Sequence, residues 1–160
     1  MINDKIKSPS ELKKIITALK KKAKTVGFTN GCFDILHYGH VKYLEDAGKK
    51  ADILIAALNS DASVNRLKGK RRPLCALKDR MRLIASLESV DYVTSFSEDT
   101  PAVIVAYLKP DIVIKGSDYK IADIVGGDIV KAYGGSVKNV KFHKGHSVTS
   151  LIKRIVKRYA

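Results

Sequence analysis

Two histidines lie three residues apart at the end of the segment 29–40, which reads Thr-Asn-Gly-Cys-Phe-Asp-Ile-Leu-His-Tyr-Gly-His. A short apolar strand is expected just before this segment and a helix over its end, so His37 and His40 lie where the helix begins. The first turn of a helix has free backbone N–H groups and partial positive charge, and each imidazole can donate a hydrogen bond. Gly31 lets the backbone approach an anion closely, and Gly39 leaves room between the histidines. The segment therefore predicts a site for phosphate groups.

The same residues admit two other chemistries. Histidines at positions i and i+3 can ligate zinc, but no third ligand lies at a familiar spacing from His37 and His40, so phosphate binding is favoured. Cys32 has the side chain of a nucleophile, yet nothing in the sequence fixes a base beside it. We therefore expect Cys32 to pack beneath the phosphate-binding loop as a small thiol.

The elements that must position these residues alternate between strands and helices. Ser8, Pro9 and Glu11 have the pattern of a helix start, and an apolar stripe follows them at helical spacing. Apolar runs predict strands over residues 25–29, 52–58, 91–96, 111–115 and 136–142. Helical patterns predict helices over 38–49, 62–67, 77–89, 101–108 and 124–133, and a terminal helix capped by Ser147. This alternation is typical of a parallel sheet covered by helices.

The fold class that follows is α/β, a Rossmann-like open parallel five-stranded sheet with helices on both faces. We expect a single domain over residues 1–160, in which residues 1–23 form an N-terminal packing helix and residues 24–160 form the α/β core. In such sheets ligands bind at the carboxyl ends of the strands, near the point where the strand order reverses. The segment 29–40 begins at one of these strand ends.

Composition narrows the class of protein further. The chain has 160 residues, 45% hydrophobic and 29% charged, a balance that suits one globular core. No apolar run approaches the roughly 20 residues of a membrane helix, and the two cysteines form no CxxC pair, so we expect a cytoplasmic protein with no membrane partner. The net charge of +14 attracts polyanions, but the lysines lack the interleaved aromatic residues of an RNA-stacking surface. Nucleic acid is therefore not the expected partner.

The histidine segment also has a specific resemblance. Gly-Cys-Phe-Asp at 31–34, followed by His-Tyr-Gly-His at 37–40, resembles the HxGH signature of the cytidylyltransferase-like nucleotidyltransferase superfamily. Within that superfamily the chain is similar to the adenylyltransferase of ADP-heptose synthesis, over nearly everything from about residue 26 to residue 155. The elements that carry this second likeness are 59–64, 66–69, 72–73, 79–80, 90–93, 98–101, 109–111 and 115–119.

The resemblance implies transfer of AMP from ATP to D-glycero-β-D-manno-heptose 1-phosphate, which gives ADP-heptose and pyrophosphate for lipopolysaccharide core or a related glycan. An oxygen of the sugar phosphate would attack the α-phosphorus in line, without a covalent enzyme intermediate. Catalysis would then rest on positioning and electrostatic stabilisation. Mg²⁺ bound with ATP is the implied cofactor, and no residue is assigned as a metal ligand of the protein.

The resemblance also implies roles for individual residues. His37 and His40 would contact the phosphates undergoing transfer, and Lys68, close to Arg71 and Arg72, would clamp phosphate oxygens from a loop. The catalytic set is His37, His40 and Lys68. The nucleotide-binding set is Asn30, Gly31, Cys32, Phe33, Gly39, His40, Ser147 and Thr149. The substrate-binding set is Asp34, Asp61, Arg72, Lys115, Gly116 and Asp118.

A second superfamily element, a Ser-Thr-Thr-like cap of the last helix, reads Ser147-Val148-Thr149 in this chain. Val148 replaces the middle threonine, and no arginine stands just before the element, so the chain departs here from the cytidylyltransferase pattern. Ser147, Thr149 and the helix amides can still bind triphosphate oxygens.

Three alternatives stay open from the sequence. A glycerol-3-phosphate cytidylyltransferase and an archaeal-type FMN adenylyltransferase share the GxFDxxHxGH start, and the phosphate-binding residues choose neither base nor acceptor. A basic nucleic-acid-binding protein that lost the chemistry is a more distant alternative. Dimers are common in the superfamily, so a homodimer is expected.

Overall fold

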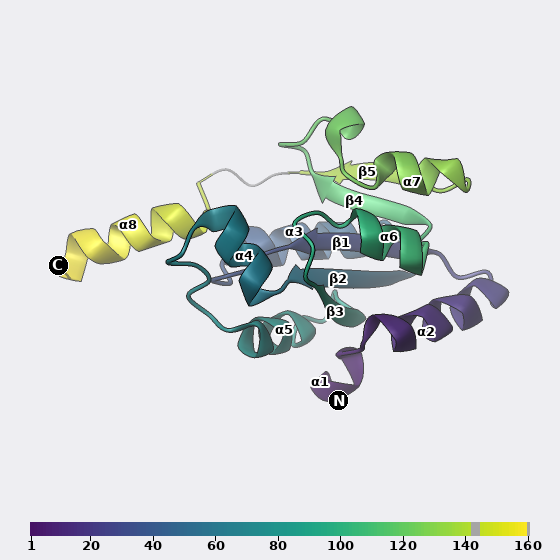
Figure 1. The fold of residues 1–160 in the computed structure, drawn as a ribbon, viewed down its shortest axis with the longest axis horizontal. Coiled ribbons are helices and arrows are strands. Elements are labelled where there is room, and N and C mark those ends of the chain that lie inside the picture. The colour runs from purple at the N-terminus through teal and green to yellow at the C-terminus, as the bar shows by residue number, and fades with distance from the viewer. Residues whose placement is uncertain (142–144, 160) are drawn as a thin grey trace.

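The computed structural model describes residues 1–141 and 145–159. Its centre is a sheet of five parallel strands in the order β3-β2-β1-β4-β5 (Figure 1). The strands are β1 (Val26–Gly31), β2 (Ile53–Asn59), β3 (Tyr92–Phe96), β4 (Ile112–Gly116) and β5 (Ser136–Val140). The predicted five-stranded, parallel, Rossmann-like α/β fold is confirmed.

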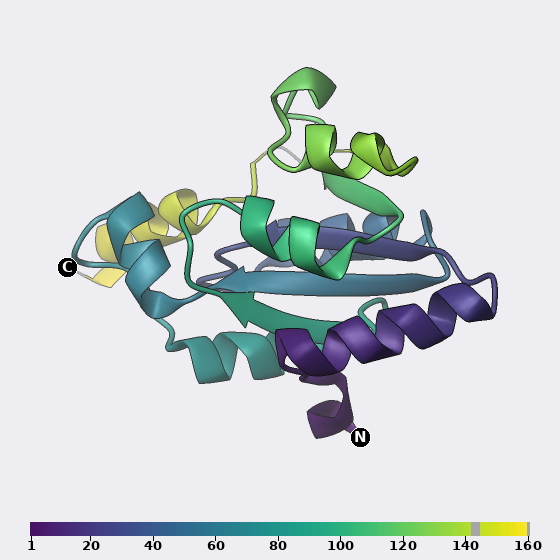
Figure 2. The ribbon, with the colours of Figure 1, turned by 45° about the vertical axis from the view of Figure 1, so that its right-hand side comes forward.

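Helices cover both faces of this sheet. One face carries α2 (Pro9–Lys21), α6 (Ala102–Leu108) and α7 (Gly127–Ala132), and Figure 2 shows α2 and α6 on the same side. The other face carries α3 (Tyr38–Gly48) and α5 (Leu77–Ala85). The remaining helical segments are α1 (Ile2–Lys5), α4 (Asp61–Lys68), the 3₁₀ turn η1 (Ile121–Asp123) and α8 (Val148–Tyr159).

Strand β2 shows how the sequence creates a core on each face. Leu54, Ala56 and Leu58 pack with the residues of α3 and α5. Ile55 and Ala57, which alternate with them, pack with α2, α6 and α7. All five side chains are fully buried. A central parallel strand is apolar on both faces for this reason, so it reads in sequence as a continuous apolar run.

The strand order reverses between β1 and β4. The chain lays β2 and β3 on one side of β1, and then crosses to place β4 and β5 on the other side. The loops that leave β1 and β4 therefore diverge, and this is where a crevice forms in sheets of this class. The last residues of these two strands include Asn30, Gly31, Lys115 and Gly116.

Two predicted helices end or begin at other residues in the structure. The helix predicted over 77–89 ends at Ala85, where the Leu87 N–H bonds the Ile84 carbonyl three residues back and the Ser86 hydroxyl donates to the Leu83 carbonyl. The helix predicted over 124–133 begins only at Gly127. Gly126, with a φ of 88°, separates it from the turn η1.

The ends of the chain also differ from the prediction. Helix α1 was not anticipated, and Ile6 after it pairs with Val93 on the edge strand β3. The last strand ends at Val140, whereas its predicted end, Phe142, lies outside the described residues. Among the described helices, none has both the length and the apolar character needed to cross a membrane.

Candidate active site

The turn after β1 is tightly folded. Phe33 is buried and has a φ of 45°, in the left-handed region that costs a non-glycine residue on the order of 1 kcal/mol. A Cβ atom at Gly31 would lie 3.0 Å from the Phe33 ring, so glycine lets the turn fold back on its own strand. Strained turns of this kind at a strand end are characteristic of functional loops.

This turn leads into two stacked imidazole rings. His37 is the N-cap residue of α3, and its Nδ1 accepts a hydrogen bond of 3.3 Å from the His40 backbone N–H. Because Nδ1 is an acceptor, Nε2 carries the proton in the neutral ring. The two ring centroids are 3.7 Å apart with 17° between the planes, and the Phe33 ring meets His40 edge-on at 5.3 Å. The sequence prediction that the histidines begin a helix is confirmed.

Both imidazoles are neutral at physiological pH. Burial, together with the neighbouring His37, lowers the pKa of His40 to about 4. Burial and the proximity of His146 lower the pKa of His37. The rings therefore offer hydrogen bonds to a ligand without adding positive charge. Nδ1 of His40 is buried and has no hydrogen-bond partner among the described residues, which leaves one polar atom of the ring unused.

Lys115 brings a cation to the same place from the end of β4. Its Nζ donates a hydrogen bond of 2.8 Å to the Asn30 carbonyl and lies 5.8 Å from the centre of the Tyr119 ring. Burial lowers the pKa of Lys115 to about 8, although Asp118 and Cys32 oppose this effect. No ion pair to Lys115 occurs in the described part of the chain. An ammonium group that is half-buried and has no counter-ion is destabilising, and an anionic ligand would offset that effect.

The surface around these residues is hollowed into two adjoining lobes of about 290 Å³ and about 630 Å³, called here the first and the second lobe. Both lobes are bordered by Asn30, Gly31, Cys32, Phe33, His40, Lys115, Tyr119 and Val148. Only the first is bordered by His37, Gly39, Tyr43, Gly116, Asp118, His146 and Ser147. Only the second is bordered by Asp34, Asn59, Val64, Leu67, Lys68, Arg72, Asp99, Thr100, Pro101, Asp123, Ile124, Val125 and Thr149. His40 and Lys115 therefore stand at the junction of the lobes.

Nearly all the residues proposed from sequence border this cavity. The predicted nucleotide-binding residues all do so, with Thr149 in the second lobe. The predicted substrate-binding residues divide between the lobes, because Gly116 and Asp118 border the first while Asp34 and Arg72 border the second. Asp61 borders neither lobe.

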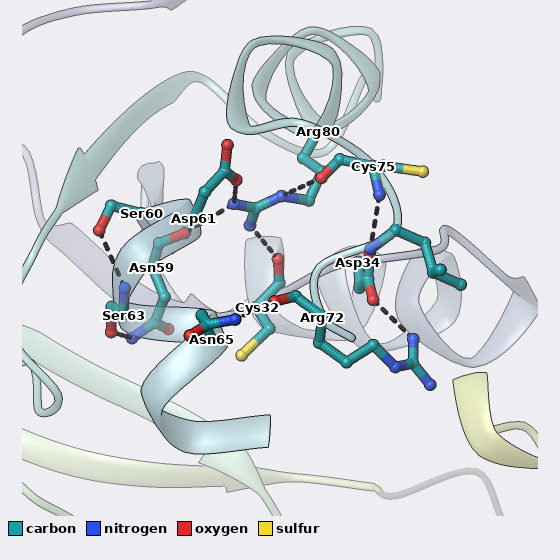
Figure 3. Close-up of polar contacts among 11 residues, drawn as sticks. Cys32, Asp34, Asn59, Ser60, Asp61, Ser63, Asn65, Arg72, Cys75 and Arg80 are labelled. Atoms are coloured by element: carbon teal, nitrogen blue, oxygen red, sulfur yellow. Dashed lines mark hydrogen bonds and ion pairs between the residues drawn. The ribbon is translucent and has the colours of Figure 1, made fainter. Parts of the chain in front are cut away.

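Asp34 and Arg72 are engaged with each other. A carboxylate oxygen of Asp34 accepts a 2.6 Å bond from Arg72, and the other accepts bonds from the backbone N–H groups of Leu74 and Cys75 (Figure 3). Burial raises the pKa of Asp34, but the bonds from Cys75, Arg72 and Leu74 outweigh it, so the net pKa is lowered. The ionised carboxylate thus anchors the loop after α4 to the end of β1, a structural task that the sequence did not indicate.

Arg80 is the residue near the site that sequence reasoning missed. Its side chain is fully buried, and its guanidinium donates to the carbonyls of Cys32, Asn59 and Cys75 and to the carboxylate of Asp61, at 2.7 Å (Figure 3). It therefore joins the ends of β1 and β2 to the starts of α4 and α5. The family resemblance predicts Asp61 as a substrate ligand, whereas its described contact is this ion pair with Arg80.

A signal for Arg80 was present in the sequence. Leu77, Met81 and Ile84 form the apolar stripe of α5, and Arg80 lies on the same face of the helix. A charged residue on the inward face of a helix is buried only when its donors are satisfied. That position therefore indicates a buried polar network.

The start of α8 completes the rim of the cavity. Ser147 caps the helix, since its Oγ accepts a 3.0 Å bond from the Ser150 N–H and its own N–H donates to the Ser150 Oγ at 3.2 Å. Val148 borders both lobes, so the residue that replaces the expected threonine faces the cavity. No side chain of α8 from Val148 to Tyr159 is buried.

The alternative chemistries receive no support from the geometry. Burial raises the pKa of the Cys32 thiol, which is therefore protonated at neutral pH and a poor nucleophile. In residues 1–141 and 145–159, no group of three or more His, Cys, Asp or Glu side chains is arranged to hold a metal ion.

Comparison with known proteins places this site in a family. A cytidylyltransferase-like family model matches residues 28–154, which include the histidine segment and the start of α8. The chain belongs to the cytidylyltransferase-like family. It is accordingly a nucleotidyltransferase enzyme, as the sequence predicted.

Similar curated proteins are longer than this chain. The bifunctional protein HldE of Pelobacter propionicus is 48% identical over 158 residues, which are 99% of this chain and 32% of that protein. The protein of the same name from Trichlorobacter lovleyi is 49% identical over 98% of this chain and 32% of its own length. The chain thus spans about a third of the length of these relatives.

Solved structures support the family and the fold. A lipopolysaccharide core biosynthesis protein from Thermoplasma volcanium is 30% identical, with a TM-score of 0.61 over 77% of this chain and 99% of that one. A pantoate-beta-alanine ligase from Francisella tularensis has a TM-score of 0.62 over 87% of this chain and 67% of its own, at 15% identity. The second likeness is one of fold alone.

Proposed function

We propose that the chain transfers AMP from ATP to D-glycero-β-D-manno-heptose 1-phosphate and releases pyrophosphate. The observation that carries nucleotidyl transfer is the junction of the two lobes, where neutral His40 and cationic Lys115 face both spaces. The choice of ATP and of a heptose phosphate is supported by the sequence elements at 59–119. The likeness to the Thermoplasma volcanium lipopolysaccharide core biosynthesis protein also supports it.

The first lobe suits the triphosphate of the nucleotide. Nε2–H of His37 can donate to phosphate oxygens, and Ser147 brings the amino end of α8, a helix of 12 residues, to the rim. With the triphosphate in this lobe, these donors would lie where negative charge grows as pyrophosphate leaves. Preorganised donors at such a position stabilise the transition state more than the bound substrate.

The second lobe suits the acceptor. It has about twice the volume of the first, and polar side chains of Asn59, Thr100 and Asp123 border it, which fits a ligand with many hydroxyl groups. Lys68, exposed at the end of α4, borders this lobe and would bind the acceptor phosphate. An acceptor phosphate oxygen would then form a bond to the α-phosphorus as the bond to the β-phosphate oxygen breaks. A donor and an acceptor in separate lobes that meet at one junction would suit an in-line displacement.

Mg²⁺ would accompany the triphosphate, as the sequence resemblance implies. The Asp118 carboxylate is exposed and borders the first lobe, so a hard oxygen ligand is present where the cation would lie. When bound, the ion would offset the negative charge on the phosphates undergoing transfer.

The test is a matrix of donors and acceptors. Purified protein with Mg²⁺ is incubated with ATP or CTP and with heptose 1-phosphate, glycerol 3-phosphate or FMN, and pyrophosphate is measured over time. Pyrophosphate is expected with ATP and heptose 1-phosphate, with a kcat/KM at least a hundredfold above every other pair. The reaction without acceptor corrects for hydrolysis of the nucleotide.

Other outcomes of this experiment would assign a different activity to the chain. Turnover with CTP and glycerol 3-phosphate, but not with heptose 1-phosphate, would replace the proposed reaction by a cytidylyl transfer. Turnover with FMN alone would indicate an FMN adenylyltransferase. Tight, steeply salt-dependent binding of RNA without any pyrophosphate release would contradict an enzymatic role.

A further inference from the structure

We infer that Lys115 is a catalytic residue that contacts two anions at once, the acceptor phosphate and the α-phosphate of the nucleotide. This deepens the proposed function and rests on it in one respect, because the acceptor is itself a phosphate. Such a reaction brings two negatively charged groups to bonding distance. A cation between them reduces their repulsion in the approach and in the transition state.

The position of Lys115 fits this task. It borders both lobes, whereas Lys68 and Arg72 border only the second. Among the residues that the structure describes around the two lobes, Lys115 is the only cation common to both. Its neighbours at the junction are His40, which is neutral, and Cys32, whose thiol is protonated.

The hydrogen bonds of Lys115 leave capacity for a ligand. An ammonium group has three N–H donors. The one hydrogen bond given for it within residues 1–141 and 145–159 goes to the Asn30 carbonyl at 2.8 Å, and a Tyr119 ring face lies at 5.8 Å. Two donors are therefore available for phosphate oxygens.

Arg72 is another cation that could be considered for this role, but its charge is already paired. Arg72 also borders the cavity, but it forms an ion pair of 2.6 Å with the buried Asp34 carboxylate. The charge of Arg72 is therefore already compensated. The charge of Lys115 is not compensated by a described carboxylate, and the nearby Asp118 acts on it only at longer range.

A functional cation of this kind is expected to cost stability in the free enzyme. A buried charge without a partner destabilises the fold, so replacing it with an apolar side chain of similar length removes the cost. A lysine with a merely structural role would give the opposite result on replacement. Stability and turnover of the same variant therefore separate the two interpretations.

The experiment compares Lys115→Met and Lys115→Arg with the matched control Lys120→Met, an exposed lysine on the loop after β4. With the acceptor and nucleotide that support turnover, Lys115→Met is expected to lower kcat at least a hundredfold and to leave the melting temperature unchanged or higher. Lys115→Arg keeps the charge, so its kcat should be at least tenfold higher than that of Lys115→Met. Lys120→Met should match the wild type within twofold.

The dependence of kcat/KM on pH is a second measurement, and it would not change if Lys115 had only a structural role. Besides Lys115, the titratable groups around the junction are Asp118, Cys32, Tyr119 and His40. Because burial holds the pKa of Lys115 at about 8, the ammonium loses its proton above that pH, and the kcat/KM of the wild type should fall about tenfold per pH unit there. In Lys115→Arg the fall in kcat/KM should begin at a much higher pH, since a guanidinium stays protonated.

A measurement of anion binding tests the contact made by Lys115 without depending on the proposed reaction. AMP alone, whose phosphate corresponds to the α-phosphate of the nucleotide, should raise the melting temperature of the wild type and of Lys120→Met, and should raise that of Lys115→Met much less. If the wild type has no transferase activity but shows this pattern, the proposed reaction fails and the anion contact stands. Equal stabilisation of all three proteins, turnover of Lys115→Met within threefold of wild type, or a marked loss of its stability would each overturn the inference.

Discussion

Arg80 and Lys115 are cations near the carboxyl end of the sheet, Arg80 fully buried and Lys115 half-buried, and the structure surrounds them differently. Arg80 donates to three backbone carbonyls and to the carboxylate of Asp61. Lys115 donates to the carbonyl of Asn30 and has no described ion pair. The region around Arg80 is complete without a ligand, whereas the region around Lys115 lacks partners that a ligand would supply.

The same contrast extends to the neighbours of each cation. Four buried side-chain polar atoms lack a hydrogen-bond partner in the described structure, and they belong to Asn30, His40, Asn139 and Thr94. Asn30 and His40 border the cavity beside Lys115, and Asn139 is paired with Lys115 in the register of β4 and β5. Three of these four residues thus lie in or beside the candidate site, and Thr94 lies apart from it on β3. The polar groups of the scaffold around Arg80 have hydrogen-bond partners within the protein, whereas several polar groups of the candidate site around Lys115 have none in the described structure.

Replacing Arg80 should break the scaffold and give the largest effect on stability. Arg80→Met leaves the carbonyls of Cys32, Asn59 and Cys75 without their donor, and the free energy of unfolding should fall by about 3–5 kcal/mol. Urea denaturation measures this change. The matched control is Arg82→Met on the same helix, since Arg82 is exposed and should change stability by less than about 0.5 kcal/mol. A loss below about 1 kcal/mol for Arg80→Met would mean that the network is not a scaffold.

Replacing His40 should have the converse effect. His40→Ala removes a neutral donor at the junction, and kcat should fall at least a hundredfold, equivalent to about 2.7 kcal/mol of transition-state stabilisation. Stability should change by less than for Arg80→Met. Steady-state kinetics and urea denaturation on one preparation measure both quantities.

A second His40 variant sharpens this result. His40→Gln keeps an N–H donor at a similar reach, so it should lose less activity than His40→Ala. Near-normal turnover in His40→Ala would remove this residue from the transfer step.

The sequence was sufficient for most of the scaffold. Strands such as β2 are continuous apolar runs, and a glycine or proline follows α4, α6 and α7 within two residues, so the order of elements and the parallel sheet could be predicted. The errors lie at boundaries set by local hydrogen bonds, such as those of Ser86 and Leu87 at the end of α5. Such bonds depend on geometry that a periodic pattern does not contain.

The site was predicted in its composition but not in its contacts. The spacing of His37 and His40 indicated a phosphate site because the helix start fixes both residues locally. The family resemblance implied Asp34, Arg72 and Asp61 as substrate ligands, and the structure pairs Asp34 with Arg72 and Asp61 with Arg80. Long-range pairs of this kind, 38 and 19 residues apart, follow from the folded chain and not from local sequence.

The smallest expected effect concerns the fit between the histidines and the start of α8. A Cβ at Gly39 would lie 2.9 Å from the Cβ of His146 and 3.2 Å from the His37 ring. Gly39→Ala should therefore displace His37 or His146 slightly and lower kcat/KM about tenfold. Stability should be unchanged or up to about 1 kcal/mol higher, because alanine favours the helix.

A double variant identifies which neighbour is displaced. In His146→Gly the Cβ atom that the added methyl group would meet is itself absent. If His146 is the neighbour that matters, Gly39→Ala combined with His146→Gly should be as active as His146→Gly alone. If the tenfold loss persists in the double variant, the displaced group is the His37 ring, and the stacked pair of imidazoles is the part of the open site that tolerates no added atom. No loss in Gly39→Ala would show that the site is loose enough to absorb a methyl group, which would weaken the contrast between scaffold and site.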